Sequence, residues 1–156
     1  MIATETPIGA SIKIDGEEIA DGIASWLEIE SPTLDVDAVN RMVDKTESDC
    51  EAAGLTTRRT PGEDGFGDLL EAFGPDADPD GARGNEQGIL VLSHLDTVHP
   101  LGTKDEANPI RREGDMLYGP GAYDMKAGAY LAFDAYRRLL AAGGNSQLPV
   151  RFMFVP

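Results

Sequence analysis

The sequence predicts an α/β fold in which helices lie on the faces of a mixed, mostly parallel sheet. Two apolar segments, residues 89–92 and 150–155, are typical of strands. The first is an unbroken run of the kind found in strands that are covered on both faces. Segments with helical periodicity lie before and between these two strands. The alternation of helices and strands favours a sheet with helices packed on it.

Two helices are expected in the N-terminal part, over residues 16–28 and 35–53. Each has one apolar side, formed by Ile19, Ile23, Trp26 and Leu27 in the first and by Val36, Val39, Val43 and Cys50 in the second. Pro32 and Gly54 follow the two helices and end them. A strand is expected at residues 55–60.

The middle of the chain is rich in Gly, Asp and Pro. We expect loops over residues 61–87 around a short turn at 66–73, with 62–65 and 74–84 as flexible surface rather than cofactor-binding loops. A hairpin is expected at residues 111–118. A further helix is expected over residues 125–142, where Leu131, Ala135 and Leu139 form an apolar face and Gly128 and Ala132 allow close packing.

A histidine and an aspartate follow the apolar strand at residues 89–92. His94 and Asp96 are two residues apart, so on an extended chain their side chains point the same way. Polar residues at the end of such a strand lie where open α/β sheets bind ligands. One imidazole nitrogen can then bind a cation while the other donates its N–H to the Asp96 carboxylate. A surface pair without function is the alternative interpretation.

A second aspartate, Asp124, follows a glycine turn at residues 119–121 and precedes the helix expected at 125–142. Aspartate is a preferred N-cap residue, so Asp124 is interpreted either as a helix cap or as a carboxylate that binds cations. The order of His94, Asp96 and Asp124 favours a metal-dependent hydrolase.

These motifs resemble those of a known family. His94-Leu95-Asp96-Thr97-Val98, followed by residues 119–128 (GPGAYDMKAG), is similar to the paired signature of the glutamate carboxypeptidase family of cocatalytic zinc peptidases. This family is related to acetylornithine deacetylase, succinyl-diaminopimelate desuccinylase and aminoacylase. Residues 31–33 and 38–42 also resemble its N-terminal region. The resemblance implies a zinc-exopeptidase-like domain that hydrolyses a peptide or amide bond, such as the bond to a C-terminal glutamate.

The same resemblance implies roles for three residues. His94 would bind one Zn²⁺, Asp124 would bridge two, and Asp96, behind the histidine, would belong to the catalytic residues. A complete site would hold two zinc ions, which activate a water and polarise the substrate carbonyl. The substrate would be a small peptide or an N-acyl amino acid. Deacylation of N-acyl amino acids is the alternative reaction.

The sequence departs from the family pattern at Pro156. In the family, two adjacent glutamates, one of them the general base, follow the strand that corresponds to residues 150–155. Residues 1–156 are therefore expected to be the N-terminal part of the catalytic domain, without its remainder or the dimerisation domain. We expect this chain alone to be inactive, and a homodimer only for the complete protein. The second alternative is a non-catalytic remnant or binding protein that keeps the fold. His99 is a less favoured substitute ligand.

Composition narrows the class of protein. The formal net charge of −15 lies entirely in residues 1–87, which disfavours nucleic acid and anionic membranes as partners. We find no signal-peptide pattern and no run long enough to span a bilayer, so a cytoplasmic location is expected. The single cysteine, Cys50, excludes an internal disulfide and is expected to be a buried thiol.

Two other enzyme classes fit poorly. A dinucleotide-binding loop would use Gly119 and Gly121, but Asp124 replaces the third glycine of that pattern. A serine hydrolase built on Ser93 lacks the Gly-x-Ser-x-Gly turn.

Overall fold

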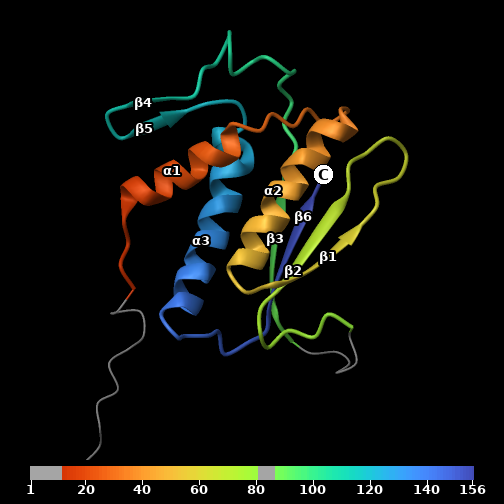
Figure 1. Ribbon diagram of the computed structural model, residues 1–156, viewed down its shortest axis with the longest axis vertical. Coiled ribbons are helices and arrows are strands. Elements are labelled where there is room, and N and C mark those ends of the chain that lie inside the picture. The colour runs from red at the N-terminus through yellow and green to blue at the C-terminus, as the bar shows by residue number, and fades with distance from the viewer. Residues whose placement is uncertain (1–11, 81–86) are drawn as a thin grey trace, which may run out of the picture.

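The computed structural model describes residues 12–80 and 87–156. Figure 1 shows the helices beside a sheet, with a separate hairpin at one end. The elements follow in the order α1 (Gly16–Leu27), α2 (Val36–Ala52), β1 (Thr56–Thr60), β2 (Leu69–Phe73), β3 (Ile89–His94), β4 (Arg111–Glu113), β5 (Met116–Tyr118), a π-helical turn η2 (Ala122–Lys126), α3 (Ala127–Ala141) and β6 (Val150–Val155).

The first two helices begin where aspartates cap them. The Asp15 side chain accepts hydrogen bonds from the backbone N–H groups of the next turn, and Asp35 accepts one from Ala38. The predicted ranges of both helices are confirmed to within one residue at each end. Their predicted apolar sides are confirmed too, since Trp26, Val39 and the Cys50 thiol are fully buried.

The four-stranded sheet is mixed, as predicted, in the order β1-β2-β6-β3. Among the described strands of this sheet, β3 and β6 pair in parallel, whereas β1–β2 and β2–β6 are antiparallel. Parallel pairing is therefore less common than we expected. The loop of residues 61–68 is too short for the crossover that a parallel β1–β2 pair would need. The predicted hairpin is confirmed as β4–β5.

Strand β2 corrects the prediction of a short turn at residues 66–73. It is a central strand, and Leu70, Ala72 and Phe73 in it are buried. A charged residue in its middle, Glu71, conceals the strand pattern in the sequence. Glu71 is buried because Arg58, at 2.7 Å, and Arg151 pair with its carboxylate.

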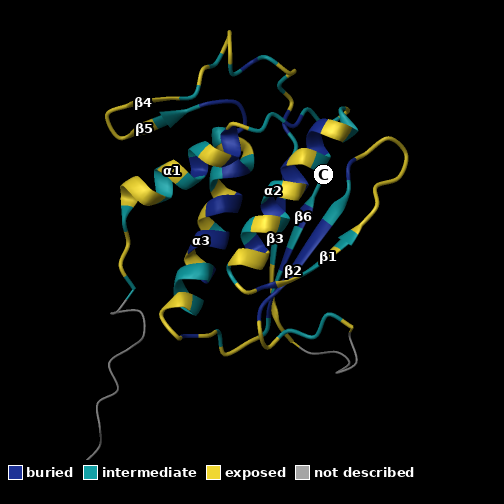
Figure 2. Ribbon diagram, viewed as in Figure 1, coloured by how far each residue is buried: buried dark blue, intermediate teal, exposed yellow. Residues whose placement is uncertain are grey.

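The core lies between the helices and one face of the sheet (Figure 2). Alternate residues of β6, Val150, Phe152 and Phe154, are buried there. The expectation that β3 is covered on both faces is wrong for the part of the chain that the structure describes. Leu90 and Leu92 are 56% and 58% exposed, because β3 is the last strand in the sheet order and no helix covers their face.

The apolar face of α3 also differs from the prediction. Leu131 is 47% exposed and Ala135 is exposed, whereas the residues that α3 buries are Ala129, Tyr130, Phe133, Asp134 and Tyr136. The aromatic rings decide this orientation, because those of Tyr130 and Phe133 lie 5.3 Å and 6.1 Å from the Trp26 ring.

Loop predictions in the middle of the chain are partly confirmed. Residues 62–65 are exposed, as expected, but Gly74 is buried beside the hydroxyl of Tyr136. Of the predicted flexible segment 74–84, residues 81–84 lie outside the described residues.

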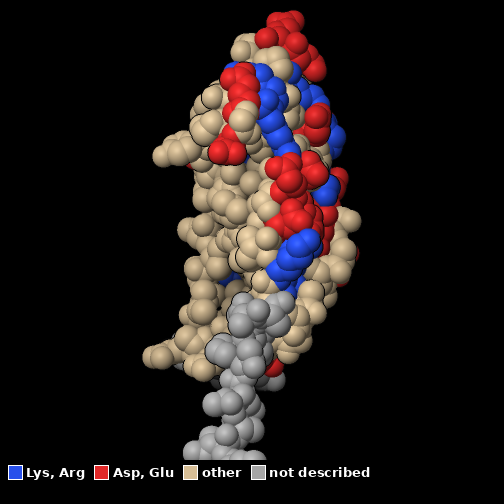
Figure 3. All heavy atoms as spheres, turned by 90° about the vertical axis from the view of Figure 1, so that its left-hand side faces the viewer, with Lys and Arg blue, Asp and Glu red and all other residues tan. Residues whose placement is uncertain are grey.

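The acidic charge is balanced in places by arginines. Figure 3 shows basic side chains interspersed among acidic ones on the side of the molecule where α1 lies. Arg112 of β4 pairs with Glu17 and Asp21 of α1, at 2.6 Å and 2.7 Å. These pairs hold the hairpin against α1, close to the site described next.

Candidate metal-binding site

His94 and Asp96 lie at the end of β3, on the same side of the chain as predicted. His94 is the last residue of the strand. Its Nδ1 lies 2.9 Å from Asp96 Oδ1 and 3.2 Å from the backbone oxygen of the same residue. The Asp96 carboxylate thus fixes the Nδ1 side of the imidazole, and Nε2 faces away from Asp96.

Asp124 approaches the other nitrogen of the same ring. Its Oδ1 lies 3.0 Å from His94 Nε2, across 30 residues of sequence. The Asp124 side chain is 79% exposed, and its backbone is not helical, with φ −127° and ψ 98°. No side chain caps α3 through a hydrogen bond. The N-cap interpretation of Asp124 is therefore wrong, and its carboxylate is directed toward the histidine.

Gly121 lets the turn come this close to β3. Its φ of 74° is in the left-handed region, which favours glycine. A Cβ atom at this position would lie only 2.5 Å from the Thr97 side chain. Any larger residue would push the turn, and Asp124 with it, away from His94.

Asp96 is itself held by a residue that the sequence analysis did not assign to the site. The Thr33 hydroxyl donates to Asp96 Oδ2, while Oδ1 faces His94. The backbone around Thr33 is fixed too, since its N–H donates to Thr97 O at 3.1 Å and the Thr97 N–H donates to Ser31 O at 2.7 Å. Both oxygens of the Asp96 carboxylate therefore have a fixed partner.

The carboxylates of Asp96 and Asp124 raise the pKa of His94. Burial alone would lower the pKa of His94, but the hydrogen bonds to Asp124 and Asp96 outweigh it and raise the pKa above the ordinary value of 6.5. Without a metal, the positively charged ring can donate to both carboxylates at once.

Lys126 is a second residue whose place in the site the sequence did not indicate. It lies two residues after Asp124 and is fully buried. Its ammonium donates to the backbone oxygen of Ile29. Burial lowers the pKa of Lys126 to about 8, while the carboxylates of Glu30 and Asp96 favour its charged form. A lysine at the start of a helix is ordinarily interpreted as a surface residue.

The donor atoms present fit zinc in kind and spacing. Zinc takes imidazole nitrogen and carboxylate oxygen at about 2.0–2.2 Å, so two ligands in a tetrahedral site lie about 3.3 Å apart. The observed separation of 3.0 Å between His94 Nε2 and Asp124 Oδ1 is close to this value. Within residues 12–80 and 87–156, however, no group of three or more His, Cys, Asp or Glu side chains is placed to hold a metal ion.

A cavity of about 550 Å³ opens beside these residues. His94, Asp96 and Asp124 line it together with Met116, Tyr118 and Tyr123 from the hairpin and the turn. His99 lines it as well, but does not combine with His94 and Asp124 into a set of three ligands. The described residues thus give no support to His99 as a substitute ligand.

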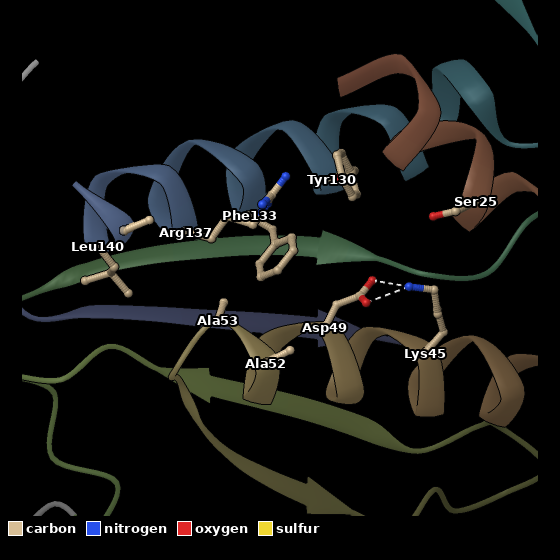
Figure 4. A pocket seen from close by; sticks show the side chains of 10 residues that line it. Ser25, Lys45, Asp49, Ala52, Ala53, Tyr130, Phe133, Arg137 and Leu140 are labelled. Carbon is tan, nitrogen blue, oxygen red and sulfur yellow. Dashed lines mark hydrogen bonds and ion pairs between the residues drawn. The ribbon is translucent and has the colours of Figure 1, made fainter. Parts of the chain in front are cut away.

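A cleft of similar size, about 600 Å³, lies between α2 and α3. Figure 4 shows Tyr130, Phe133 and Leu140 of α3 on one side of the cleft, with Phe133 above Asp49 of α2 and Leu140 above Ala53. The Lys45 ammonium lies 2.5 Å from the Asp49 carboxylate, which also accepts a hydrogen bond from the Trp26 indole at 2.8 Å. Arg137, which also lines the cleft, pairs with Asp134 at 2.5 Å, so the charged side chains of the cleft all have ion-pair partners.

Comparisons with known proteins bear on the family and the fold of this chain. The model of peptidase family M20/M25/M40 matches residues 90–156, which include all three predicted site residues. Carboxypeptidase G2 from Pseudomonas sp. (strain RS-16) is 48% identical over 42 residues, which are 27% of this chain and 10% of that protein. The resemblance predicted from the motifs is thereby confirmed.

Solved structures confirm the fold. Human carnosine dipeptidase 1 has a TM-score of 0.71 and 16% identity, over 95% of this chain and 33% of that chain. The aminopeptidase PepT from Bacillus cereus has a TM-score of 0.69 and 17% identity, over 90% and 36%. The metallo-carboxypeptidase Sso-CP2 from Sulfolobus solfataricus has a TM-score of 0.66 and 17% identity, over 91% and 31%. The chain thus spans about a third of these structures and a tenth of the curated relative.

None of the helices in the described part of the chain is long and apolar enough to cross a membrane.

Proposed function

Because residues 90–156 match the model of peptidase family M20/M25/M40, we propose that this chain supplies one side of a two-zinc site for hydrolysis of a peptide or amide bond. The observation that carries the proposal is the approach of His94 Nε2 and Asp124 Oδ1 to 3.0 Å, with Asp96 behind the imidazole. Two residues from distant segments meet in the order and spacing that the motifs of this family predict.

Each residue has a distinct task in this proposal. Asp96 accepts the Nδ1–H of His94, so the neutral ring presents the lone pair of Nε2 to the cation. The Asp124 carboxylate, which lies beside His94 Nε2, would help to hold both cations. When bound, the pair of zinc ions lowers the pKa of a water and polarises the carbonyl that is attacked.

We propose that the remaining groups come from outside residues 1–156. A catalytic zinc ordinarily has three protein ligands, whereas His94 and Asp124 offer two donors between them. By the family resemblance, the general base and the other ligands follow the segment equivalent to β6. The 156 residues then form the N-terminal part of the catalytic domain, and the complete protein forms the homodimer.

The substrate class we propose is a small peptide, cleaved in the manner of a carboxypeptidase with release of a C-terminal amino acid such as glutamate. The name of the relative that is 48% identical over 42 residues, Carboxypeptidase G2, supports this choice. The open exposure of Asp124 supports access of a small substrate to the metal from the cavity.

Calorimetric titration of the chain with Zn²⁺ tests the proposal. We expect weak binding that His94→Ala and Asp124→Asn abolish. His99→Ala is the matched control, because it removes the other imidazole of the same cavity, and should leave the affinity unchanged. Binding that survives His94→Ala would contradict the proposed ligand.

Hydrolysis is measured on the same samples. A glutamyl dipeptide incubated with the zinc-loaded 156-residue chain should remain intact, because the general base is expected elsewhere. Turnover that His94→Ala abolishes would overturn the expected inactivity of the isolated chain.

A further inference from the structure

Two of the residues that line the cavity beside β3 are the most exposed large apolar side chains in the described part of the chain. Tyr123 is 99% exposed and Val98 is 89% exposed, and a third lining residue, Met116, is 57% exposed. Isolated exposed apolar residues are ordinary on a protein surface, but three around one cavity form a patch of the kind found at ligand-binding sites. We call these three residues the apolar rim.

The apolar rim is built from three different segments. Val98 follows β3, Met116 is the first residue of β5, and Tyr123 belongs to the turn η2. The less exposed lining of the same cavity is apolar too, since it includes Ile23 of α1 and Ala127 of α3, which belong to the hydrophobic core or pack against it. Apolar surface therefore extends from the core to the solvent within one cavity.

The size and the lining of this cavity suit a small, mostly apolar group. Its volume of about 550 Å³ lies within the range of about 300–1,000 Å³ that is usual for small-molecule sites. Such sites combine apolar walls with a few polar groups that fix the orientation of the ligand. Here His94 and Asp124 lie at the wall, and His99 and Asn108 can form hydrogen bonds with a neutral amide.

The charges around the cavity argue against an anionic ligand group at the apolar rim. Among residues 12–80 and 87–156, no lysine or arginine is part of the cavity lining. Arg111 stacks on the ring of Tyr118, 4.2 Å from its centroid, but it is not a lining residue and pairs with Glu113 at 2.7 Å. A carboxylate among the rim side chains would lose hydration without gaining an ionic partner there. The cavity therefore favours a neutral group.

We propose that the apolar rim is the subsite for the acyl group of the substrate, which is the group on the carbonyl side of the bond that is cleaved, and that it selects neutral apolar acyl groups over charged ones. This inference rests on the proposed function, which places the cations at His94 and Asp124 in the same cavity. The amino acid that is released carries a carboxylate, for which the rim has no partner, so the acyl side of the substrate lies against the rim. Tyr123, next to Asp124 in sequence, packs its ring on the acyl group. The rim residues determine specificity and take no part in the chemical step.

Two probes of equal chain length test this preference without metal or turnover. N-hexanoylglycinamide is neutral, whereas N-adipoylglycinamide has a carboxylate at the far end of its acyl chain. We expect the neutral probe to shift the methyl resonances of Val98 and Met116 and the ring resonances of Tyr123 in ¹H–¹³C NMR spectra. We expect the anionic probe to bind about tenfold more weakly or worse. Equal affinities, or no shift at these residues with the neutral probe, would overturn the proposal.

Tyr123→Ala measures the contribution of the exposed ring. We expect it to weaken binding of N-hexanoylglycinamide by up to about tenfold, because an aromatic packing surface is lost. Phe66→Ala is the matched control, since this ring is also exposed but lies in the loop between β1 and β2 and does not line the cavity. It should leave the affinity unchanged. An equal loss in both variants, or none in Tyr123→Ala, would contradict a role for Tyr123 in binding.

Met116→Lys distinguishes a selective subsite from unspecific apolar adhesion. The new ammonium gives the carboxylate of N-adipoylglycinamide an ionic partner at the rim, so the order of the two affinities should reverse. Because Met116 is largely exposed, we expect the melting temperature to stay the same. An unchanged order of affinities would show that the acyl chain does not reach the rim, and would overturn the proposal.

The failure of this inference is distinguishable from failure of the proposed function. If zinc binds through His94 but N-hexanoylglycinamide shifts no rim resonance, the subsite is wrong and the function stands. If the probe binds at the rim with the expected selectivity while zinc does not bind through His94, the rim is a binding site for acyl amides and the proposed hydrolysis is wrong.

Discussion

Two cavities of similar volume differ in the interaction partners and the solvent exposure of their polar groups. The cleft between α2 and α3 measures about 600 Å³ and the cavity beside β3 about 550 Å³. In the cleft, Lys45, Asp49 and the Trp26 indole satisfy one another. In the cavity, His94 and Asp124 meet at its wall, and the Asp124 side chain is mostly exposed to solvent.

The difference shows that volume alone does not identify a site. In the cleft, Lys45 and Asp49 pair within α2, and the Trp26 indole joins α1 to the same carboxylate. In the cavity, the Thr33 hydroxyl donates to Asp96, and Asp96 in turn fixes Nδ1 of His94. As a result, Nε2 of His94 and the Asp124 carboxylate face each other at the cavity wall. A cation or substrate can bind where such lone pairs converge, and the following predictions test whether the two regions separate in this way.

The largest expected effect is a loss of stability when the aromatic cluster between the helices and the sheet is disrupted. Trp26→Ala removes a fully buried indole whose ring lies within 6.3 Å of those of Tyr130, Phe133 and Phe154. We expect a loss of about 3–5 kcal/mol in the free energy of unfolding. Urea denaturation measures it, and a loss below about 1 kcal/mol would show that this cluster is not the core.

The reactivity of Cys50 gives the next largest effect. Burial raises the pKa of its thiol to about 12 from a model-peptide value of 9.0. At pH 8 the thiolate fraction is then about a thousandfold smaller in the folded than in the unfolded chain. Because the folded state holds this proton more tightly, its contribution to stability is present below pH 9 and lost as the pH rises toward 12. Thiol titration with a chromogenic disulfide should be slow until urea is added, whereas rapid native labelling would place a reactive nucleophile on α2.

Asp96→Asn tests the cavity side. An amide leaves the shape of the side chain almost unchanged, but no longer fixes the proton on His94 Nδ1. We expect zinc affinity to fall by about 10–100-fold, with little change in the melting temperature. Unchanged affinity in calorimetry would remove Asp96 from the site.

Asp49→Asn is the matched substitution in the cleft, and we expect it to have the smallest effect of the four substitutions and measurements. It weakens the pair with Lys45 and the hydrogen bond to Trp26, so we expect a loss of about 1 kcal/mol in stability. Zinc affinity should equal that of the wild type. A fall in affinity comparable to that of Asp96→Asn would end the distinction between the two cavities.

Sequence patterns that span a few residues were sufficient to predict the helices and strands that the structure confirms. The period of two places His94 and Asp96 on one side, and the spacing of apolar residues predicts α1 and α2. β3 and β6 follow from apolar runs. In each case the information lies within a few residues of sequence.

The features that the sequence did not indicate depend on distant partners. β2 contains Glu71, which only its arginine partners make compatible with a buried strand. The orientation of α3 depends on where Trp26 lies. Lys126 is buried although it is charged, and its ammonium donates to the backbone oxygen of Ile29, far away in the sequence. Tertiary context overrides local propensity at all three positions.

The most direct test of the zinc site is anomalous diffraction at the zinc edge from crystals of the chain soaked with Zn²⁺. We predict a peak within about 2.0–2.2 Å of His94 Nε2 and of an Asp124 oxygen, at the mouth of the cavity beside β3. Zinc bound in the α2–α3 cleft, or a His94 ring turned away from Asp124 in the zinc-soaked crystal, would contradict the account.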